Sequence, residues 1–475
     1  MTSMNMSPTY LLPEAILFAG AVLTLLTGSF LPQRRLGLTR VLTVLVLVAA
    51  GLTAAVAWAD PAGPVFAGTF AADGPTGAAR VIIIGATILV VTLGTPELTG
   101  RARQAETYVL LLLSALGSVV LAGANDLLVL AVGFLLSSVP LYALVGMERT
   151  ALAAEGALKT YLIGALTGIL LLLGATVLFG VAGTTGYGEL AAALPEAPVA
   201  AVTLGLIAVL GGLTFKMGAV PGHFWVPDAA QGASTTVAAF LTTVPKIGAV
   251  IAAYRLVDLA PVSADAGLFV ALLAAVTMTL GNLAAFAQTD PRRLLGWSTV
   301  SQAGYLLLPV AVAGRSDLAI PSMLLYLAGY ALSNLTGFAV VAASPGRSDL
   351  SAYRGLAGSR PWVAGALLVA LLSLVGTPPT AVFAGKLTTF AAAWDGGLAW
   401  LVVIAALNTV ASLFYYLRWL APAFRTAESI GLEQTGPATR DGWAGATAVA
   451  GGAAVLVLGL AAPLLWTVLE GQLAR

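Results

Sequence analysis

Apolar segments long enough to cross a lipid bilayer follow one another along the whole chain. A bilayer core needs about 20 apolar residues per helix, because every backbone N–H and C=O must be bonded within the segment. Fourteen such segments cover residues 10–30, 41–58, 78–95, 106–123, 126–146, 157–182, 198–220, 234–257, 266–288, 294–313, 318–343, 361–393, 397–420 and 443–468. The sequence therefore predicts an all-α, polytopic membrane protein with about 14 transmembrane helices, in a single integral membrane domain over residues 1–475.

The composition excludes several classes of protein. Hydrophobic residues make up 59% of the chain and charged residues only 9%, against about 25% charged in soluble proteins, so a water-soluble globule is excluded. A net charge of +1 does not provide the positively charged surface that nucleic-acid binding requires. The absence of cysteine excludes disulfides, thiolate metal sites and Cys-ligated iron–sulfur clusters, and a single histidine argues against a haem pair. The first span lacks a basic leader and a clear cleavage site, so we expect a retained helix rather than a signal peptide.

The arginines predict the orientation, because positively charged loops stay on the cytoplasmic side. Alternate loops share the 18 arginines unevenly. One side holds Arg34, Arg35, Arg40, Arg101, Arg103, Arg149, Arg292, Arg293, Arg347, Arg354, Arg360, Arg418, Arg425 and Arg440, and the other holds Arg80, Arg255, Arg315 and Arg475. This distribution predicts a multi-pass protein of the cell membrane with both termini on the non-cytoplasmic side.

The only four lysines all fall within predicted helices: Lys159, Lys216, Lys246 and Lys386. An ammonium at mid-bilayer costs about 2.5–3.5 kcal/mol on insertion scales, so it normally faces a bundle interior or a hydrated cavity. Lysine can release its proton when buried, whereas arginine stays charged. The pattern favours a proton relay.

Each of these residues also has a plainer interpretation. Lys159 is close enough to a helix end to extend to the interface as an anchor, and the other three lysines could serve as structural ion pairs or bind backbone carbonyls. Glu14 is the one clearly intramembrane acid, and it could also be a hydrated residue at a helix entrance.

Helix breakers lie beside two of the lysines. Pro221 follows Lys216, and Pro378-Pro379 precede Lys386. Proline removes a backbone donor and frees carbonyls, and paired broken helices are typical of transporters, although a kink for packing is the alternative.

The first break also carries the only histidine and an acid. His223 could buffer a proton or sit at the interface beside Trp225, and Asp228 follows it.

Several short segments, taken together, closely resemble the antiporter-like membrane subunits of respiratory complex I and of multisubunit cation/proton antiporters. They are Leu12-Pro13-Glu14, Ala124-Asn125-Asp126-Leu127, Pro140-Leu141-Tyr142-Ala143-Leu144-Val145-Gly146, Glu155-Gly156-Ala157-Leu158-Lys159, the stretch from Phe215 to Asp228, Gly232-Ala233-Ser234-Thr235, Val244-Pro245-Lys246, Arg293-Leu294-Leu295-Gly296-Trp297-Ser298, Ser333-Asn334-Leu335 and Gly376-Thr377-Pro378-Pro379. The Pro-Glu in the first span, the fourteen helices and the lack of a long C-terminal extension are most similar to the subunit N branch.

The resemblance implies two inverted five-helix repeats, with discontinuous helices at the seventh and twelfth spans. The halves would cover residues 105–257 and 266–420, flanked by helices over 10–95 and 443–468. It also implies that Lys216 is the central relay base of the first half, Lys246 the connecting lysine, Lys386 the terminal residue of the second half and Lys159 an auxiliary.

One position departs from the family pattern, which places a glutamate five residues before the proline that is Pro140 here. This chain has Leu135 there, and no acid lies between Asp126 and Glu148. Either Glu155 or another subunit supplies the charge that acts on Lys216, or the chain is a divergent paralogue. Gln231 and Ser234, where relatives often carry an acid and a proline, fit divergence.

Three functions remain open from the sequence. The leading one is a proton-translocating membrane-arm subunit of a complex I-type NADH:quinone oxidoreductase, embedded in the bilayer among other membrane and peripheral subunits. This chain would hold no cofactor, metal or redox centre of its own, while quinone, NADH, flavin and iron–sulfur clusters belong to the whole complex. The alternatives are a cation/proton antiporter subunit and a structural paralogue that does not pump.

Overall fold

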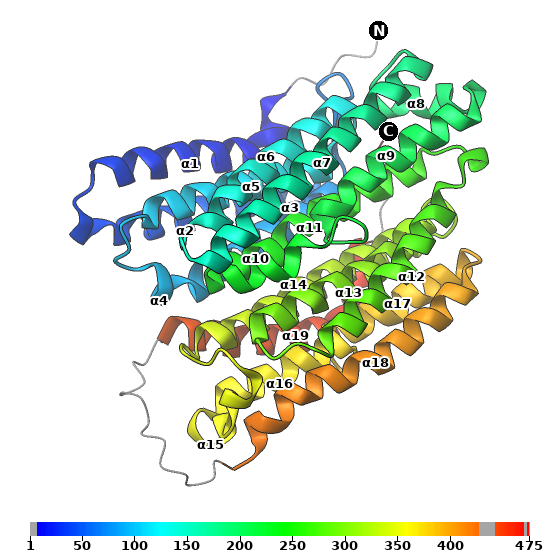
Figure 1. The fold of residues 1–475 in the computed structure, drawn as a ribbon. Helices are drawn as coiled ribbons and strands as arrows, with labels where there is room; N and C mark the ends of the chain where they lie inside the picture. Colours follow the sequence, from blue (N-terminus) through cyan, green and yellow to red (C-terminus); the bar gives the residue numbers. More distant parts are fainter. Residues whose placement is uncertain (1–6, 427–441, 470–472, 475) are drawn as a thin grey trace.

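The computed structural model describes residues 7–426, 442–469 and 473–474, and these are almost all helical (Figure 1). The helices are α1 (Leu12–Phe30), α2 (Gly37–Ala59), α3 (Gly74–Leu93), α4 (Thr95–Leu98), α5 (Gln104–Gly123), α6 (Leu127–Gly146), α7 (Ala151–Ala182), α8 (Tyr187–Ala193), α9 (Val199–Met217), α10 (Trp225–Gly232), α11 (Thr235–Asp258), α12 (Ala266–Ala285), α13 (Pro291–Ala311), α14 (Ala319–Ala342), α15 (Leu356–Ser359), α16 (Pro361–Val375), α17 (Ala381–Asp395), α18 (Ala399–Phe424) and α19 (Gly442–Leu469). Short 3-10 turns occupy Pro8–Leu11, Gln33–Arg35, Leu194–Glu196, Val262–Ala264 and Leu350–Tyr353, and an antiparallel hairpin joins β1 (Gly63–Val65) to β2 (Phe70–Ala72).

The prediction of an all-α polytopic membrane protein is confirmed. Within the described residues, 12 helices are long and apolar enough to span a membrane. Two predicted segments are not among these 12 helices. One corresponds to α13, which is long enough to span a membrane but carries the polar residues Thr299 and Gln302, both buried. The other corresponds to the pair α16 and α17, which have 15 residues each. The fourteen apolar segments of the sequence thus each have a helical counterpart.

Two helices are interrupted inside the molecule. α9 ends at Gly218 and α16 at Gly376, both in the left-handed conformation that glycine adopts without strain. Pro221 follows the first end and Pro378-Pro379 the second, and both links contain a cis X-Pro bond. The seventh and twelfth predicted spans are therefore the discontinuous ones.

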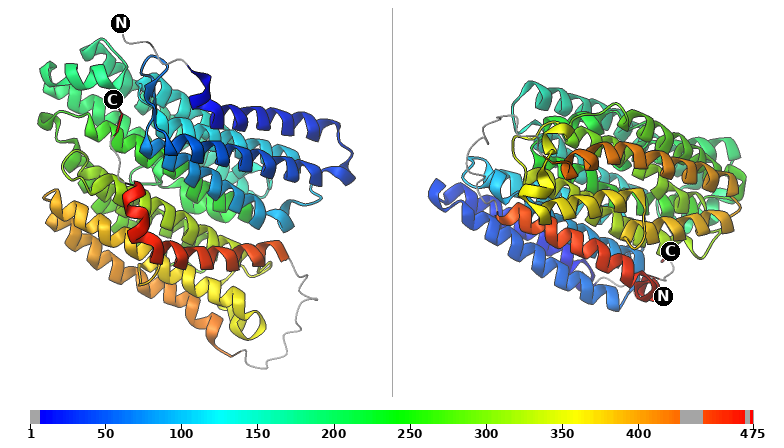
Figure 2. Two further views of the ribbon diagram at one scale, coloured as in Figure 1. Left: turned by 180° about the vertical axis from the view of Figure 1, so that it is seen from behind. Right: turned by 90° about the horizontal axis from the view of Figure 1, so that it is seen from below.

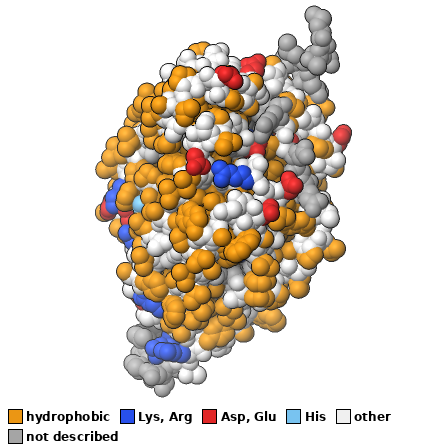
Figure 3. Space-filling view, turned by 90° about the vertical axis from the view of Figure 1, so that its right-hand side faces the viewer, with side chains coloured by type: hydrophobic (Ala, Val, Ile, Leu, Met, Phe, Trp, Pro, Cys, Tyr) orange, Lys and Arg blue, Asp and Glu red, His pale blue; other side chains and the backbone are white. Residues whose placement is uncertain are grey.

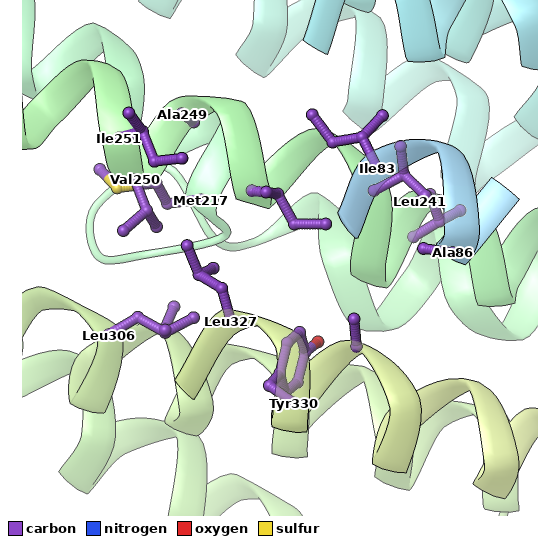
Figure 4. Packing of buried hydrophobic residues seen from close by; sticks show 14 of the residues in the cluster. Ile83, Ala86, Met217, Leu241, Ala249, Val250, Ile251, Leu306, Leu327 and Tyr330 are labelled. Carbon is purple, nitrogen blue, oxygen red and sulfur yellow. The ribbon is translucent and has the colours of Figure 1, made fainter. Parts of the chain in front are cut away.

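The helices form two neighbouring series, α5 to α11 and α12 to α18 (Figures 1 and 2). α3 contacts both α11 and α14 and so bridges the series, while α19 packs on α14 and α16. Ile83 of α3 and Leu241 of α11 face Tyr330 of α14 in the shared apolar core (Figure 4). The polar side chains described below lie within this otherwise apolar interior.

The loops gather at two opposite ends of the bundle. At one end Arg101 pairs with Glu148, Arg293 with Asp228, and the Arg40 guanidinium lies over the Trp443 ring. We call this the arginine-rich end; Arg440 and Arg475 lie outside the described residues.

The opposite end holds both described ends of the chain. The Arg80 side chain donates to the Tyr10 carbonyl at 2.9 Å, and the Ala474 backbone N–H donates to Asp73 at 3.0 Å. Asp73 and Arg80 both belong to the start of α3, so the two chain ends share one face, as an even number of spans requires.

Large apolar side chains remain exposed along α1, α2, α7 and α18, among them Phe18, Leu52, Leu166 and Leu407. The space-filling view is likewise dominated by hydrophobic side chains with few charges (Figure 3). Such faces suit lipid tails or neighbouring membrane subunits.

Candidate functional site

Lys216 lies in the last turn of α9 and is only 2% exposed. Its Nζ donates to the Ser137 hydroxyl of α6 at 3.2 Å and lies 5.6 Å from the ring centres of Phe134 and Phe215. A cation is favoured at a helix C-terminus, where carbonyls lack intrahelical partners. Leu135, two residues before Ser137, is 47% exposed, so the side chain that contacts Lys216 comes from Ser137 instead.

Buried hydroxyls continue from Ser137 toward α11. The Ser137 and Ser118 hydroxyls are 3.1 Å apart, and Ser114 donates to the Ser137 carbonyl at 2.9 Å. The Ser118 backbone packs against Gly248 of α11, two residues after Lys246. The hydroxyls beside Lys216 thus lead to the part of α5 that packs on α11, the helix that carries Lys246.

Lys246 is 2% exposed in the middle of α11, directly after Pro245. Its Nζ donates to the Thr299 carbonyl of α13 at 2.6 Å and lies 4.9 Å from the Tyr330 ring centre. The Tyr330 hydroxyl contacts the Thr299 hydroxyl at 3.0 Å and donates to the Thr242 carbonyl at 2.7 Å. Lys246 thus joins the first helical series to the second.

Lys386 is 3% exposed on α17, but its ammonium reaches back to the end of α16. The Nζ donates to the carbonyls of Val375 at 2.9 Å and Leu374 at 3.3 Å, and lies 4.0 Å from the Tyr305 ring centre. The prolines after α16 provide no N–H for these carbonyls, so the break supplies the acceptors. Gly376 leaves room for the lysine, because a Cβ there would lie 2.9 Å from the Lys386 Cδ.

Gln302 and Tyr326 lie between the two lysine sites. Gln302 Nε2 donates to the Leu374 carbonyl at 2.8 Å, the same carbonyl that Lys386 contacts, and Tyr326 donates to Gln302 Oε1 at 2.5 Å. Gln302 is three residues from Thr299 on α13, so about 4.5 Å separates them along the helix axis. Neutral polar groups thus extend from Lys246 to Lys386.

Lys159 belongs to a different environment. Its side chain is 40% exposed, and its Nζ binds Glu155 and Asp228 at 2.5 Å each. Asp228 also pairs with Arg293 at 2.5 Å, and Arg293 donates to Gln231 at 3.1 Å. Glu155, considered above as a charge for Lys216, is therefore engaged with Lys159 at the arginine-rich end.

His223 is 1% exposed in the link between α9 and α10. Its ring centre lies 4.1 Å from that of Phe224 and 5.8 Å from that of Trp297. Among the described residues neither ring nitrogen has a hydrogen-bond partner of normal geometry.

Glu14 is paired at the opposite end of the bundle. It is 6% exposed, accepts from Arg80 Nε at 2.8 Å, and lies apart from the lysines. Arg80 is itself buried and lies 5.5 Å from the Phe70 ring centre. The sequence pointed to Glu14 but not to its partner, since Arg80 looked like a loop residue.

Other residues of the site escaped the sequence prediction. Ser137, Gln302 and Tyr326 belong to residue types that are common in membrane helices, and only their burial beside a lysine distinguishes them. Gln302 did carry a signal, since it follows Ser298, Thr299 and Ser301 in a polar section of a predicted span. Within the described part of the chain, no three His, Cys, Asp or Glu side chains cluster as metal ligands.

The three buried lysines share one chemical feature. None takes part in the ion pairs found among the described residues, and each ammonium donates to a neutral hydroxyl or carbonyl oxygen. A lysine amine can gain or lose a proton, and hydroxyls and amides between amines can order the water that carries it. The three sites thus combine amines that can exchange protons with neutral oxygens as their partners.

Comparison with known proteins gives the family. Residues 124–412 match the family described as NADH:quinone oxidoreductase/Mrp antiporter, TM. The chain is 51% identical over 464 residues to NADH-quinone oxidoreductase subunit N of Mycobacterium sp. (strain JLS), covering 97% of this chain and 98% of that one. It is 54% identical over 460 residues to NADH-quinone oxidoreductase subunit N 1 of Streptomyces griseus, covering 96% and 97%.

A solved structure agrees over the same length. The chain superimposes on one in respiratory complex I from Thermus thermophilus with bound aureothin, with a TM-score of 0.83, 34% identity, and coverage of 97% of this chain and 100% of that one. With these relatives spanning nearly its whole length, the chain belongs to the NADH-quinone oxidoreductase subunit N family, the antiporter-like membrane subunits of respiratory complex I.

Proposed function

We propose that this subunit translocates protons in the membrane arm of its NADH:quinone oxidoreductase. Lys216, Lys246 and Lys386 form the relay, and Ser137, Gln302 and Tyr326 connect the three amines. Lys159, paired with Asp228 at the arginine-rich end, acts as an auxiliary that exchanges protons with water. His223, buried in the first helix break, is a secondary site.

The observation that carries this proposal is the set of three buried amines bonded only to neutral oxygens. A lysine kept for structure would be expected to face a carboxylate, because an unpaired buried charge is costly. Here each ammonium instead donates to a serine hydroxyl or a backbone carbonyl. Both helix breaks lie beside this row, which supports a transport role over a packing kink.

The electron-transfer chemistry belongs to other subunits in this proposal. NADH, quinone, flavin and iron–sulfur clusters act elsewhere in the complex, and their reaction drives the protonation changes of the lysines. The arginine-rich end faces the cytoplasm, and both chain ends face the other side of the membrane.

Lys216 variants in the intact complex test the proposal. We expect Lys216→Ala to lower proton transport per NADH oxidised at least severalfold in inverted membrane vesicles. Lys216→Arg should fail in the same way, since arginine keeps its proton. NADH oxidation with a soluble artificial acceptor controls for assembly, and an unchanged proton-to-electron ratio in both variants would contradict the proposal.

A subunit that seals the arm without pumping is the second candidate. Its supporting observation is that Lys216 contacts Ser137, while Leu135 carries an alkyl group where the family pattern has a glutamate. A gain of proton transport in Leu135→Glu, relative to an unchanged Leu128→Gln control on the same helix, would favour this candidate.

A cation/proton antiporter subunit is the third, because the matched family description covers both groups. Sodium-dependent proton flux without NADH would favour it.

A further inference from the structure

An apolar groove opens at the arginine-rich end between the first turns of α16 and α19. Its lining comprises Arg360, Trp362, Val363, Gly442, Gly445, Ala446 and Val449, and its volume is about 680 Å³. That lies within the roughly 300–1,000 Å³ of sites that hold ligands of drug size. From Gly442 to Val449 the groove follows about 10 Å of helix at 1.5 Å per residue, which is a length suited to the upper part of a lipid tail.

The Arg360 guanidinium stands at the mouth of this groove, and Arg347 belongs to the loop that follows α14. Arg360 donates to the Ala343 carbonyl, and a Cβ at Gly445 would lie 3.6 Å from Arg360 Nη2, so one edge of the guanidinium faces the groove. Burial and, to a smaller extent, the like charge of Arg360 lower the pKa of Arg347, while Tyr353 acts in the opposite direction. The two arginines are neighbours, because Arg360 bonds the Ala343 carbonyl and the turn that follows is closed by the Arg347 N–H donating to the Ser344 carbonyl at 3.3 Å.

Neither arginine is neutralised within the described residues. No ion pair found there involves Arg347 or Arg360, and the buried Arg347 Nη1 has no hydrogen-bond partner in that part of the chain. Two neighbouring cations with a spare donor create a site for an anion with several acceptor oxygens, such as a phosphate.

Exposed tryptophans flank the same groove. Trp362 is 78% exposed on α16 and Trp443 is 57% exposed on α19, where the Arg40 guanidinium lies 5.6 Å from its ring centre. Tryptophan is enriched at the headgroup level of membranes, and arginine side chains there attract anionic lipids. The two tryptophans place the groove mouth at the membrane surface and its apolar walls in the hydrocarbon.

We propose that this groove binds one anionic phospholipid, whose phosphate contacts Arg360 at the groove mouth and whose acyl chain lies along Gly442, Gly445 and Val449. The missing side chains of the two glycines make the space for the chain. A soluble phosphate would use the guanidinium groups but leave the apolar walls exposed. A second protein helix would fill the walls but leave Arg360 without an anion.

The chain contains no cysteine, so Ala446→Cys, at an exposed position inside the groove, accepts a single fluorophore. In nanodiscs of the full chain, we expect brominated phosphatidylglycerol to quench this fluorophore at about fivefold lower mole fraction than brominated phosphatidylcholine, the factor for one basic residue beside an anionic lipid. Adding Arg360→Gln should abolish the preference, and adding Arg34→Gln, at the same end but outside the groove, should preserve it.

A variant with a larger side chain inside the groove tests separately whether the acyl chain binds there. Gly445→Leu keeps both arginines, and its Cβ would meet Arg360 and Val363 at ordinary contact distances of 3.6 and 3.9 Å. We expect this variant of the intact complex to co-purify with one phosphatidylglycerol fewer than the unaltered complex, as measured by mass spectrometry of extracted lipid. Equal quenching by the two lipids, a preference that survives Arg360→Gln, or an unchanged lipid count would each overturn the proposal.

Discussion

Lys216 and Lys386 occupy equivalent electrostatic positions although they come from different sides of their helix breaks. Lys216 is part of the last turn of α9, whereas Lys386 starts on α17 and extends back to the carbonyls of Leu374 and Val375 at the end of α16. Both ammoniums therefore lie at the negative end of a half-helix dipole. The break after α16 supplies carbonyl acceptors to Lys386, whereas Lys216 has the Ser137 hydroxyl of α6 as its acceptor.

A substitution at Tyr326 tests whether the polar groups between Lys246 and Lys386 take part in proton transport. Tyr326→Phe removes the hydroxyl that donates to Gln302 at 2.5 Å and frees the amide to rotate away from the Leu374 carbonyl. We expect proton transport to fall severalfold in vesicles, because a proton-transfer step loses an ordered partner. Tyr187→Phe is the matched control, since the buried Tyr187 hydroxyl has no partner among the described residues; equal losses in both variants would count against the connection.

A substitution at Gly376 tests whether the position of the Lys386 side chain matters for proton transport. Its φ of +96° is unfavourable for other residues, and an added Cβ would lie 2.9 Å from the Lys386 stem. Gly376→Ala should therefore displace the ammonium and reduce proton transport, whereas Gly358→Ala, where a Cβ meets nothing within 4 Å, should not. Proton uptake per NADH in the two variants measures the difference.

At the scale of elements, α11 is anchored by a carboxylate from outside its own sequence. Glu97 of α4 accepts from the backbone N–H groups of Thr235 and Thr236 at 3.0 and 2.9 Å and from the Thr236 hydroxyl at 2.6 Å. It supplements the Ser234 cap at the start of the helix. Because α11 carries Lys246, this anchor also helps to fix the position of Lys246 along the helix axis.

Removing that anchor should weaken the fold. Glu97→Ala leaves two backbone donors without their charged acceptor, and we expect a loss of about 1–3 kcal/mol in the free energy of unfolding. Thermal denaturation of the purified chain in detergent measures it. Asp60→Ala, an exposed acid in the link after α2, is the control; identical shifts in both variants would show that Glu97 does not stabilise α11.

Sequence patterns predicted the spans and the two breaks but not the partners of the charged groups. Length and hydropathy are local properties, so the bounds of α9 and α11 and the start of α16 were predicted closely, whereas the end of α16 at Val375 lies well inside the predicted segment 361–393. The pairing of Glu97 with Thr236 or of Arg80 with Glu14 joins residues 139 and 66 positions apart. Such contacts depend on how helices assemble, which apolar periodicity does not encode.

At the scale of the whole molecule, one buried ion pair joins several distant segments. Arg255 of α11 donates to Asp73 at 2.7 Å and to Thr76 at 2.8 Å, and the Ala474 backbone N–H donates to the same carboxylate. Burial alone would raise the pKa of Asp73, but the Arg255 charge and hydrogen bond hold it below its usual range. The cluster therefore ties α3, α11 and the C-terminal residues together.

The stability of the molecule should depend on this carboxylate in acid. Because the folded pKa of Asp73 is lower than that of the unfolded chain, its contribution is present above about pH 4 and is lost as the pH falls through the folded value. Asp73→Asn should cost about 3–5 kcal/mol at pH 7 by leaving Arg255 unpaired, and should remove part of the acid dependence. Denaturation across pH 3–7 measures both effects.

The exposed Arg315–Asp265 pair, separated by 3.4 Å, offers the control. Asp265→Asn should change stability by at most about 1 kcal/mol, since exposed ion pairs contribute little. An Asp73→Asn variant that behaved like Asp265→Asn would mean that the buried pair does not hold the segments together.

The polarity of α13 has a consequence for biosynthesis. Its buried Ser298, Thr299, Ser301 and Gln302 contribute no favourable free energy of transfer into the hydrocarbon of the membrane. Insertion of this segment alone by the translocon is therefore unfavourable compared with insertion of a fully apolar helix. α12 and α14 supply acceptors for those groups, among them Asn282 for Ser301 and Tyr330 for Thr299. We therefore expect the translocon to retain α13 until α14 has emerged, so that the three helices enter the bilayer together.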